Sequence, residues 1–212
     1  MHWLDIRRRL KRATAACEAV GASDTCLSVQ PSASRAEITA MEGVLGATLP
    51  AALRTTFLEF SRGVVMSWSL DKNAEPPFKG IFSGACDWSL DALPVVEEGR
   101  RSWIATCFPD RANAYDHIWH DKLAFSAVGN GDLLAIDLKA PGEPVVYLSH
   151  EDSQIHGWRL GHDFLDYLDR CSRLGFVGME DWQLEPFLMD STSGLQPDGE
   201  NGKTWRKWFG VP

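Results

Sequence analysis

The spacing of apolar residues in the first quarter of the chain predicts helices. Residues 1–20 have Trp3, Ile6 and Leu10 on one side of a short amphipathic helix that carries arginines around it. Residues 21–33 are polar and are interpreted as a loop. Ser34 and Glu37 have the spacing of a capping box that opens a second helix. The buried stripe of that helix consists of Ile38, Met41, Val44 and Leu45, and Gly46 can end it.

A third helix and the first strand follow directly. Leu49-Pro50 opens the helix, because proline is tolerated in a first helical turn, and the helix runs to Gly63. Its apolar residues at helical spacing are Leu53, Phe57 and Phe60. Alternation of apolar and polar residues then predicts a strand over residues 64–70, with Trp68 on its apolar face. We expect the two helices to pack as a hairpin.

The middle of the chain contains one helix and the clearest strand signals. A helix is predicted at about residues 90–106, with Leu93, Val96, Trp103 and Cys107 facing inward. Farther along, residues 123–128 and 132–138 flank the turn Gly129-Asn130-Gly131, where glycine tolerates positive φ. Residues 145–149 add a further strand. Short connections between these three strands predict an antiparallel meander.

The last part of the chain combines one regular helix with an irregular, aromatic-rich extension. The helix spans residues 163–174 and ends at Gly175. Residues 176–212 show no long period, but their aromatic content predicts a tail that wraps on the domain. No internal repeat and no linker divides the chain. We therefore predict one α+β domain over residues 1–212, with a core at about 35–175.

The charge distribution narrows the possible partners. The net charge is −8, whereas residues 1–12 sum to +4, so the other 200 residues sum to −12. An acidic body disfavours nucleic acid and anionic membranes and favours a basic protein partner. No apolar run is long enough to span a bilayer. The five cysteines are odd in number and form no C-x-x-C pair, which fits reduced thiols and a cytoplasmic location.

Motifs for catalysis and cofactor binding are missing from the sequence. It contains no Gly-x-Ser-x-Gly, no GxxxxGK[ST] and no GxGxxG, and Cys107 has no evident histidine partner. His117-x-x-His120 could share a metal, but we interpret both as exposed loop histidines without further ligands. Asp132 is interpreted as capping its turn. We therefore expect no catalysis, no cofactor and no metal.

The order of the helix and strand signals resembles the SUKH superfamily. The resemblance begins with Glu42-x-x-Leu45-Gly46, Leu49-Pro50 and Phe57-Leu58. It continues with Gly129-Asn-Gly-Asp132, the run 133–138, and Pro144-Val-Val-Tyr-Leu-Ser-His-Glu151. The superfamily includes yeast cell-wall assembly regulators of the Smi/Knr type and bacterial relatives. It implies a twisted antiparallel sheet with helices packed on one side. In bacteria it implies an immunity protein that neutralises a toxin, often a nuclease or deaminase.

A protein-binding surface is predicted on the exposed sheet face and its bordering loops. Its aromatic anchors are Trp68 or Trp158, and its acidic rim consists of Asp71, Asp137, Glu151 and Asp152. These carboxylates would stand in for nucleic-acid phosphates if the partner is a basic toxin domain. Two other functions stay open: a regulatory scaffold of the Smi/Knr type, and a small hydrolase that uses His150 and Glu151.

Overall fold

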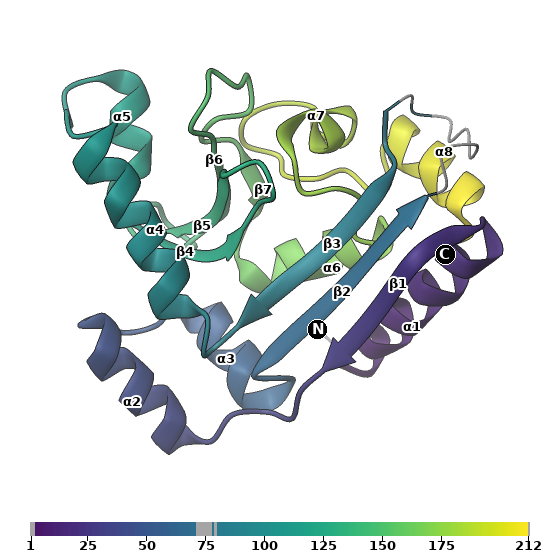
Figure 1. The fold of residues 1–212 in the computed structure, drawn as a ribbon, viewed down its shortest axis with the longest axis horizontal. Coiled ribbons are helices and arrows are strands. Elements are labelled where there is room, and N and C mark those ends of the chain that lie inside the picture. The colour runs from purple at the N-terminus through teal and green to yellow at the C-terminus, as the bar shows by residue number, and fades with distance from the viewer. Residues whose placement is uncertain (1–2, 71–77, 79, 212) are drawn as a thin grey trace.

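The computed structural model describes residues 3–70, 78 and 80–211 and shows an α+β fold (Figure 1). The helices are α1 (Trp3–Ala19), α2 (Arg35–Leu45), α3 (Ala51–Glu59), α4 (Leu93–Thr106), α5 (Ala114–Trp119), α6 (Phe164–Arg173), α7 (Asp181–Leu184), the 3-10 helix η1 (Glu185–Phe187) and α8 (Glu200–Phe209). The strands are β1 (Ala22–Val29), β2 (Gly63–Leu70), β3 (Ser83–Ser89), β4 (Lys122–Ala127), β5 (Leu133–Asp137), β6 (Val145–Leu148) and β7 (Arg159–Gly161). The predicted fold class is confirmed. None of the described helices is long and apolar enough to cross a membrane.

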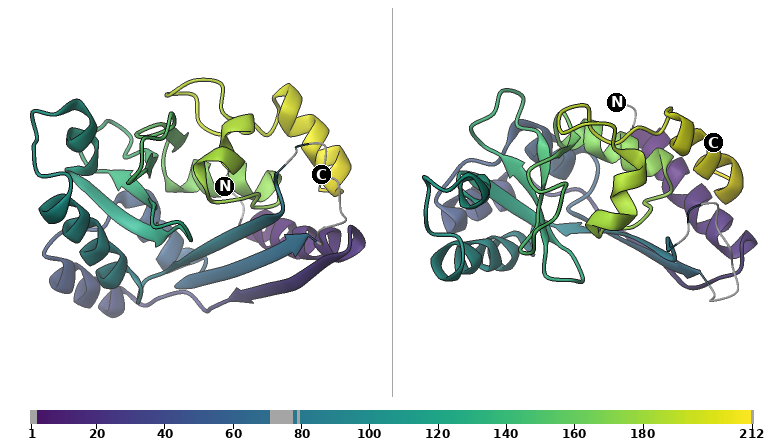
Figure 2. Two further views of the ribbon diagram at one scale, coloured as in Figure 1. Left: turned by 45° about the horizontal axis from the view of Figure 1, so that its top comes forward. Right: turned by 90° about the horizontal axis from the view of Figure 1, so that it is seen from above.

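The first sheet is antiparallel with the order β1-β2-β3. Its inner face carries Met66, Trp68 and Trp88, all buried in the main core. Figure 2 shows α1, α6 and α8 together on this side, while no helix is drawn across the opposite face. The opposite face bears mostly small and polar side chains, including Ser67, Ala85 and exposed Asp87. The expectation of helices on one side of a sheet holds for this sheet.

Two strands of this sheet were not predicted, and the interpretation of residues 21–33 as a loop is wrong. β1 pairs with β2 from Ala22 to Val29, with an irregularity between Ser23 and Cys26. Asp24 has φ +53 at this irregularity, which interrupts the alternation that marks a strand. No strand was predicted at β3 because its interior contains Gly84 and other small residues in place of β-branched ones.

The second sheet contains the predicted meander in the order β4-β5-β6, extended by β7. Both of its faces are buried. Phe125, Ile136 and Tyr147 belong to the main core, whereas Ala135 and Val146 belong to a second core with α4 and α5. Burial on both faces explains why these strands read as nearly continuous apolar runs.

The buried side of α4 agrees with the prediction in part. Leu93 is buried, but Cys107 is exposed and Trp103 and Val96 are only half-buried. The buried polar residues of this helix are Glu97 and Arg100, which pair with each other. The predicted inward face is right for Leu93, Val96 and Trp103, because the last two pack against the second core, and wrong for Cys107. The buried ion pair was missed because charged residues at helical spacing usually mark a solvated face.

In the N-terminal helical hairpin, α2 has the predicted boundaries, whereas α3 begins as predicted but ends at Glu59, before Gly63, where β2 begins. Ser34 and Glu37 form a complete capping box, with the Glu37 amide donating to Ser34 Oγ at 3.2 Å and the Ser34 amide donating to Glu37 Oε2 at 2.8 Å. Gly46 ends α2 in the left-handed conformation, with φ +69. Local signals were sufficient here because each cap is satisfied within a few residues.

The C-terminal extension packs on the first sheet, as predicted. Trp205 of α8 is buried against Trp68, with ring centroids 6.3 Å apart, and stacks on Phe209. The Trp205 indole donates to the carbonyl of Leu174 at 2.9 Å. The extension therefore contributes to the main core.

Candidate protein-binding surface

The predicted surface residues do not form one patch. Trp68 is 1% exposed, and its indole donates to the carbonyl of Gly175 at 2.9 Å. It cannot act as a surface anchor, and the assignment is wrong because the apolar side of β2 faces the helices. Asp71 lies outside the described residues. Trp158 is half-buried and packs against the main core.

The predicted acidic rim is divided between opposite ends of β5. Asp137 ends this strand, accepts from the amides of Lys139 and Ala140, and lies 3.2 Å from Lys122 Nζ. Glu151 and Asp152 follow β6 near the start of β5, because Leu133 pairs with Leu148. Four strand steps separate the two ends, roughly 14 Å at about 3.4 Å per residue. Asp137 therefore acts locally as a turn anchor, whereas Glu151 and Asp152 are exposed.

A buried polar network holds the loop that carries Glu151 and Asp152. Asp132 is 1% exposed and accepts from Tyr147 Oη at 2.6 Å, and its other carboxylate oxygen lies 2.6 Å from His150 Nδ1. The His150 amide donates to the same carboxylate at 2.8 Å. Burial alone would raise the pKa of Asp132, but the hydrogen bonds from Tyr147, His150 and Asn130 together hold that pKa below its ordinary value. Asp132 is thus the centre of a network as well as part of its turn.

The rings of Tyr115 and His156 also support the loop that carries Glu151 and Asp152. The Tyr115 hydroxyl lies within hydrogen-bond distance of the carbonyls of Ser149 and Glu151. The Tyr115 ring stacks on His156, with centroids 3.9 Å apart. These contacts fix the backbone, while the Glu151 side chain remains 83% exposed. The result is a rigid loop that presents carboxylates to solvent.

Phe82, which directly precedes β3, and Trp182, in α7, form an exposed aromatic pair. Phe82 and Trp182 are 55% and 37% exposed, and their ring centroids are 5.9 Å apart. The Trp182 indole donates to Glu180 Oε2 at 2.6 Å. Isolated exposed apolar residues are common, but a contacting aromatic pair is typical of a binding anchor. We call Phe82, Trp182, Glu180, Asp181, Glu151 and Asp152 the aromatic–acidic surface.

The C-terminal extension holds the aromatic pair against the first sheet. The amide of Gly178 donates to the carbonyl of Ser83 at 3.0 Å, and Gln183 Nε2 lies 3.3 Å from Ser83 Oγ. A Cβ atom at Gly80 would lie 3.1 Å from the Trp182 ring. Because Ser83 directly follows Phe82, these contacts position both aromatic rings.

The negative charge of Asp181 acts on two tyrosines that hold the loop of Glu151 and Asp152. Burial raises the pKa of Tyr115, and the nearby negative charges of Asp132, Asp152 and Asp181 raise it further. Asp181 acts in the same direction on the pKa of Tyr147. Asp181 directly precedes Trp182 in the sequence. In Figure 1, α7 and the loop after β6 lie at the same edge of the molecule.

The prediction missed Phe82, Trp182, Glu180 and Asp181. A signal was available in the sequence, because Trp182 directly follows Glu180-Asp181 in a segment without helical period. An acidic pair beside a tryptophan in an irregular segment favours exposure of that tryptophan. Its contact with Phe82, a hundred residues earlier, has no such signal.

The structure also shows where the two histidines of the His117-x-x-His120 motif lie. His117 is exposed on α5, as expected, but His120 is buried, with Nε2 3.0 Å from the carbonyl of Phe108. The interpretation of both as exposed loop histidines is therefore wrong for His120, which the end of α5 turns inward. Among residues 3–70, 78 and 80–211, no group of three or more His, Cys, Asp or Glu side chains could hold a metal ion.

A model of the SMI1 / KNR4 family (SUKH-1) matches residues 32–193, which is most of the chain. No curated protein sequence matches. The matched region includes the whole aromatic–acidic surface, whereas α1, β1 and α8 lie outside it.

Proposed function

The chain belongs to the SMI1/KNR4 family (SUKH-1), and on this premise we propose that it is a protein-binding module that acts as an immunity protein. It would bind a bacterial toxin domain of the nuclease or deaminase type in the cytoplasm and block its action. The toxin class comes from the resemblance to the SUKH superfamily. The geometry of this chain supports the aromatic–acidic surface as the place of binding.

The observation that carries the proposal is the exposed Phe82–Trp182 pair, which lies at the same edge of the molecule as the loop with the exposed residues Glu151 and Asp152 and is next to half-buried Asp181. Aromatic anchors supply most of the binding free energy at protein interfaces. Carboxylates around them attract the basic surface with which a nuclease binds phosphates. The net charge of −8 adds attraction at long range.

The rigidity of the surface also supports a binding role. The Asp132 network and the Tyr115 contacts fix the acidic loop, and the Gly178–Ser83 hydrogen bond fixes the aromatic pair. Binding a partner would therefore cost little conformational entropy, because these groups are already held in place.

The test uses toxin domains encoded beside the gene of this protein. Each would be expressed with and without the protein, survival of the cells would be measured, and association would be followed by surface plasmon resonance. Trp182→Ala should raise the Kd at least tenfold, mainly through the off-rate, because it removes an anchor. Glu151→Lys combined with Asp152→Lys should lower the on-rate at 0.1 M salt, and the effect should shrink at 1 M salt.

The matched control is Glu98→Lys, an exposed charge reversal on α4 outside the aromatic–acidic surface. It should leave the on-rate within about twofold after its small change in net charge is considered. If toxin association is insensitive to Trp182→Ala and to the acidic double reversal, the aromatic–acidic surface is not the interface. If no neighbouring toxin domain is neutralised, the immunity role fails.

A regulatory scaffold of the Smi/Knr type is the second candidate. The same family membership supports it, and the aromatic–acidic surface would serve an endogenous partner equally well. The two functions separate in the survival experiment, because a scaffold gives no protection against a toxin. Loss of growth regulation in a deletion strain without any toxin gene would favour the scaffold.

The hydrolase candidate has one supporting feature. The 2.6 Å contact of Asp132 with His150 Nδ1 is the way a carboxylate orients a catalytic histidine, and His150 Nε2 lies 3.7 Å from Glu151 Oε1. Within the described part of the chain, no hydroxyl or thiol hydrogen-bonds to His150 as a nucleophile would. Ester or phosphodiester hydrolysis that disappears in a His150→Ala, Glu151→Ala double variant would establish this function.

A further inference from the structure

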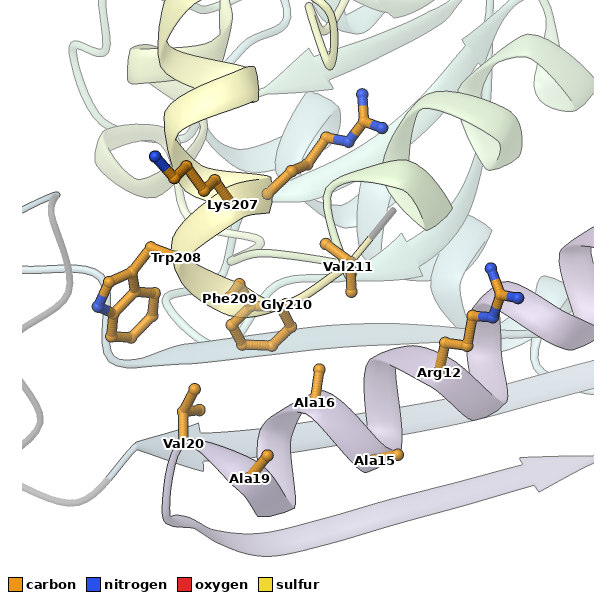
Figure 3. Close-up of a pocket in the computed structure, with 11 residues that line it drawn as sticks. Arg12, Ala15, Ala16, Ala19, Val20, Lys207, Trp208, Phe209, Gly210 and Val211 are labelled. Carbon is orange, nitrogen blue, oxygen red and sulfur yellow. The ribbon is translucent and has the colours of Figure 1, made fainter.

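A groove runs between the two helices that lie outside the family match. Its volume is about 770 Å³, and α1 contributes Arg12, Ala15, Ala16, Ala19 and Val20 to its lining. The other wall is the end of α8 with Lys207, Trp208, Phe209, Gly210 and Val211. Figure 3 shows Ala16 pointing toward the ring of Phe209, with Trp208 at one end of the groove and Arg12 at the other. The floor is therefore apolar and made of small side chains.

The charge of this region is opposite to that of the rest of the protein. α1 carries five basic and two acidic residues, and α8 carries three basic and one acidic residue, so together they sum to +5. The whole chain has −8, which leaves −13 on all other residues. A second hollow of about 330 Å³, lined by Arg8, Arg9, Arg12, Arg173, Arg206 and Asp5, adjoins the groove.

Two positively charged side chains at the groove, Arg12 and Lys207, form no ion pair within the described part of the chain. Neither Arg12 nor Lys207 has an acidic partner or a hydrogen bond among residues 3–70, 78 and 80–211, and both are exposed. By contrast, Arg9 lies 2.5 Å from Asp169, and Arg173 pairs with Asp198. Arg12 and Lys207 can therefore pair with an incoming anion at no cost in internal contacts.

The shape of the groove favours a helix as its occupant. Ala15 and Ala19 are one turn apart and exposed, and such small residues let a second helix approach closely. The stretch from Arg12 to Val20 spans about 12 Å at 1.5 Å per residue, or a little more than two turns. A helix placed there would bury its apolar side on Trp208, Val20 and the alanines. Its flanks would meet Arg12 and Lys207.

Two other classes of occupant fit less well. The apolar side of α1, with Ile6, Leu10 and Cys17, is buried in the core and is not available to enter a lipid surface. The phosphate backbone of nucleic acid would leave the apolar lining of the groove uncovered, whereas an amphipathic helix buries it. We therefore propose that the groove between α1 and α8 binds an acidic, amphipathic helical segment of a protein partner. This site is separate from the aromatic–acidic surface and does not depend on the proposed immunity function.

The experiment uses the full chain and a defined probe. The probe is a fluorescent peptide of about 16 residues, long enough to form a helix, with leucines on one side and glutamates on both flanks. Its affinity is measured by fluorescence anisotropy. The position of binding is measured by NMR from the methyl signals of Ala15, Ala16 and Ala19. A second peptide with lysines in place of the glutamates tests the charge requirement.

We expect the acidic peptide to bind and to shift these alanine signals. Arg12→Glu with Lys207→Glu should raise the Kd at least tenfold, and Ala15→Trp, which fills the groove from an exposed position, should do the same. The matched control is Lys203→Glu, an exposed reversal on α8 away from the groove, which should change the Kd less than twofold.

Several results would overturn the proposal. These are no shift of the alanine signals, equal affinity for the lysine peptide, and loss of affinity in Lys203→Glu as large as in the groove variants. Groove-dependent binding of anionic vesicles or of single-stranded DNA more tightly than of the acidic peptide would also overturn it. Toxin neutralisation is measured separately, and it should be unchanged in the groove variants. Failure of one proposal therefore leaves the other standing.

Discussion

Asp132 and His150 are joined by two contacts to one carboxylate oxygen, from the His150 amide at 2.8 Å and from Nδ1 at 2.6 Å. The second carboxylate oxygen accepts from Tyr147. A carboxylate buried in this way stabilises the fold only while it is ionised, because all of its partners donate or can donate a hydrogen bond.

Asp132→Asn should therefore lower the free energy of unfolding at pH 7 by about 1–3 kcal/mol. The pKa of Asp132 is depressed in the folded state, so its stabilisation is present above about pH 3.8 and is lost as the pH falls through the folded pKa. The difference between wild type and variant should shrink below pH 4 in urea unfolding. Glu98→Gln, at an exposed position, is the control. An unchanged stability at pH 7 would contradict this role for Asp132.

His156 should make the protein less stable in mildly acidic solution. The Ser149 amide donates to His156 Nδ1 at 3.0 Å, so Nδ1 carries no proton and Nε2 donates to the carbonyl of Tyr115 at 3.1 Å. Burial is the main cause that lowers the pKa of His156 from its ordinary 6.5. The unfolded chain then binds more protons, so stability falls as the pH drops below 6.5, until the folded pKa is reached.

Unfolding measured between pH 7.5 and about 5 checks this expectation. His156→Gln should reduce the pH dependence in this window, whereas His117→Gln on the exposed side of α5 should not. An identical pH profile for wild type and His156→Gln would show that His156 contributes nothing.

Glu97 and Arg100 form a buried ion pair that connects α4 to the second sheet. Arg100 Nη2 lies 2.7 Å from Glu97 Oε1, and Glu97 also accepts from the amide of Ala124 in β4. Arg100→Met leaves a buried carboxylate without its main partner and should cost about 3–5 kcal/mol. Replacing both residues, as Glu97→Leu with Arg100→Met, should cost less than the sum of the single changes. Strict additivity in urea unfolding would argue against coupling.

Gly84 permits the first sheet to approach the C-terminal extension. A Cβ atom there would lie 2.3 Å from the Trp68 ring and 2.3 Å from the carbonyl oxygen of Phe176. Gly84→Ala should therefore destabilise the protein by about 1–3 kcal/mol through overpacking. Gly43→Ala in α2 is the matched control. A Cβ atom at Gly43 would have no other atom within 4 Å, so this substitution should stabilise the protein by up to about 1 kcal/mol. Equal effects of the two substitutions would contradict the close approach.

What could be predicted from the sequence depended on how local the stabilising contacts are. Ser34, Glu37 and Gly46 set the ends of α2 through contacts a few residues apart, and the glycine-flanked turn set the β4–β5 hairpin. β1 and β3 depend on pairing with β2 across long separations and carry mostly small or polar residues, so they gave no strand signal.

The same limit applies to the candidate surface. Trp68 and Trp182 are the same residue type, yet one is buried under α8 and the other is exposed beside Phe82. The C-terminal extension determines which of the two tryptophans is buried, because it covers the inner side of β2 and leaves the start of β3 open. The exposure of Glu151 and Asp152 was available from a turn signal, but their separation from Asp137 was not.

The packing of α1 against α8 joins two segments that lie far apart in the sequence. Trp68 rests on Trp205 and Phe209, and Gly210 lies against Ala16. During synthesis α1 and β2 therefore leave the ribosome long before α8, which supplies part of their cover. Until α8 emerges, Ala16 and the ring of Trp68 remain open to solvent and to other nascent chains. This interval is the period in which the growing chain most needs a chaperone.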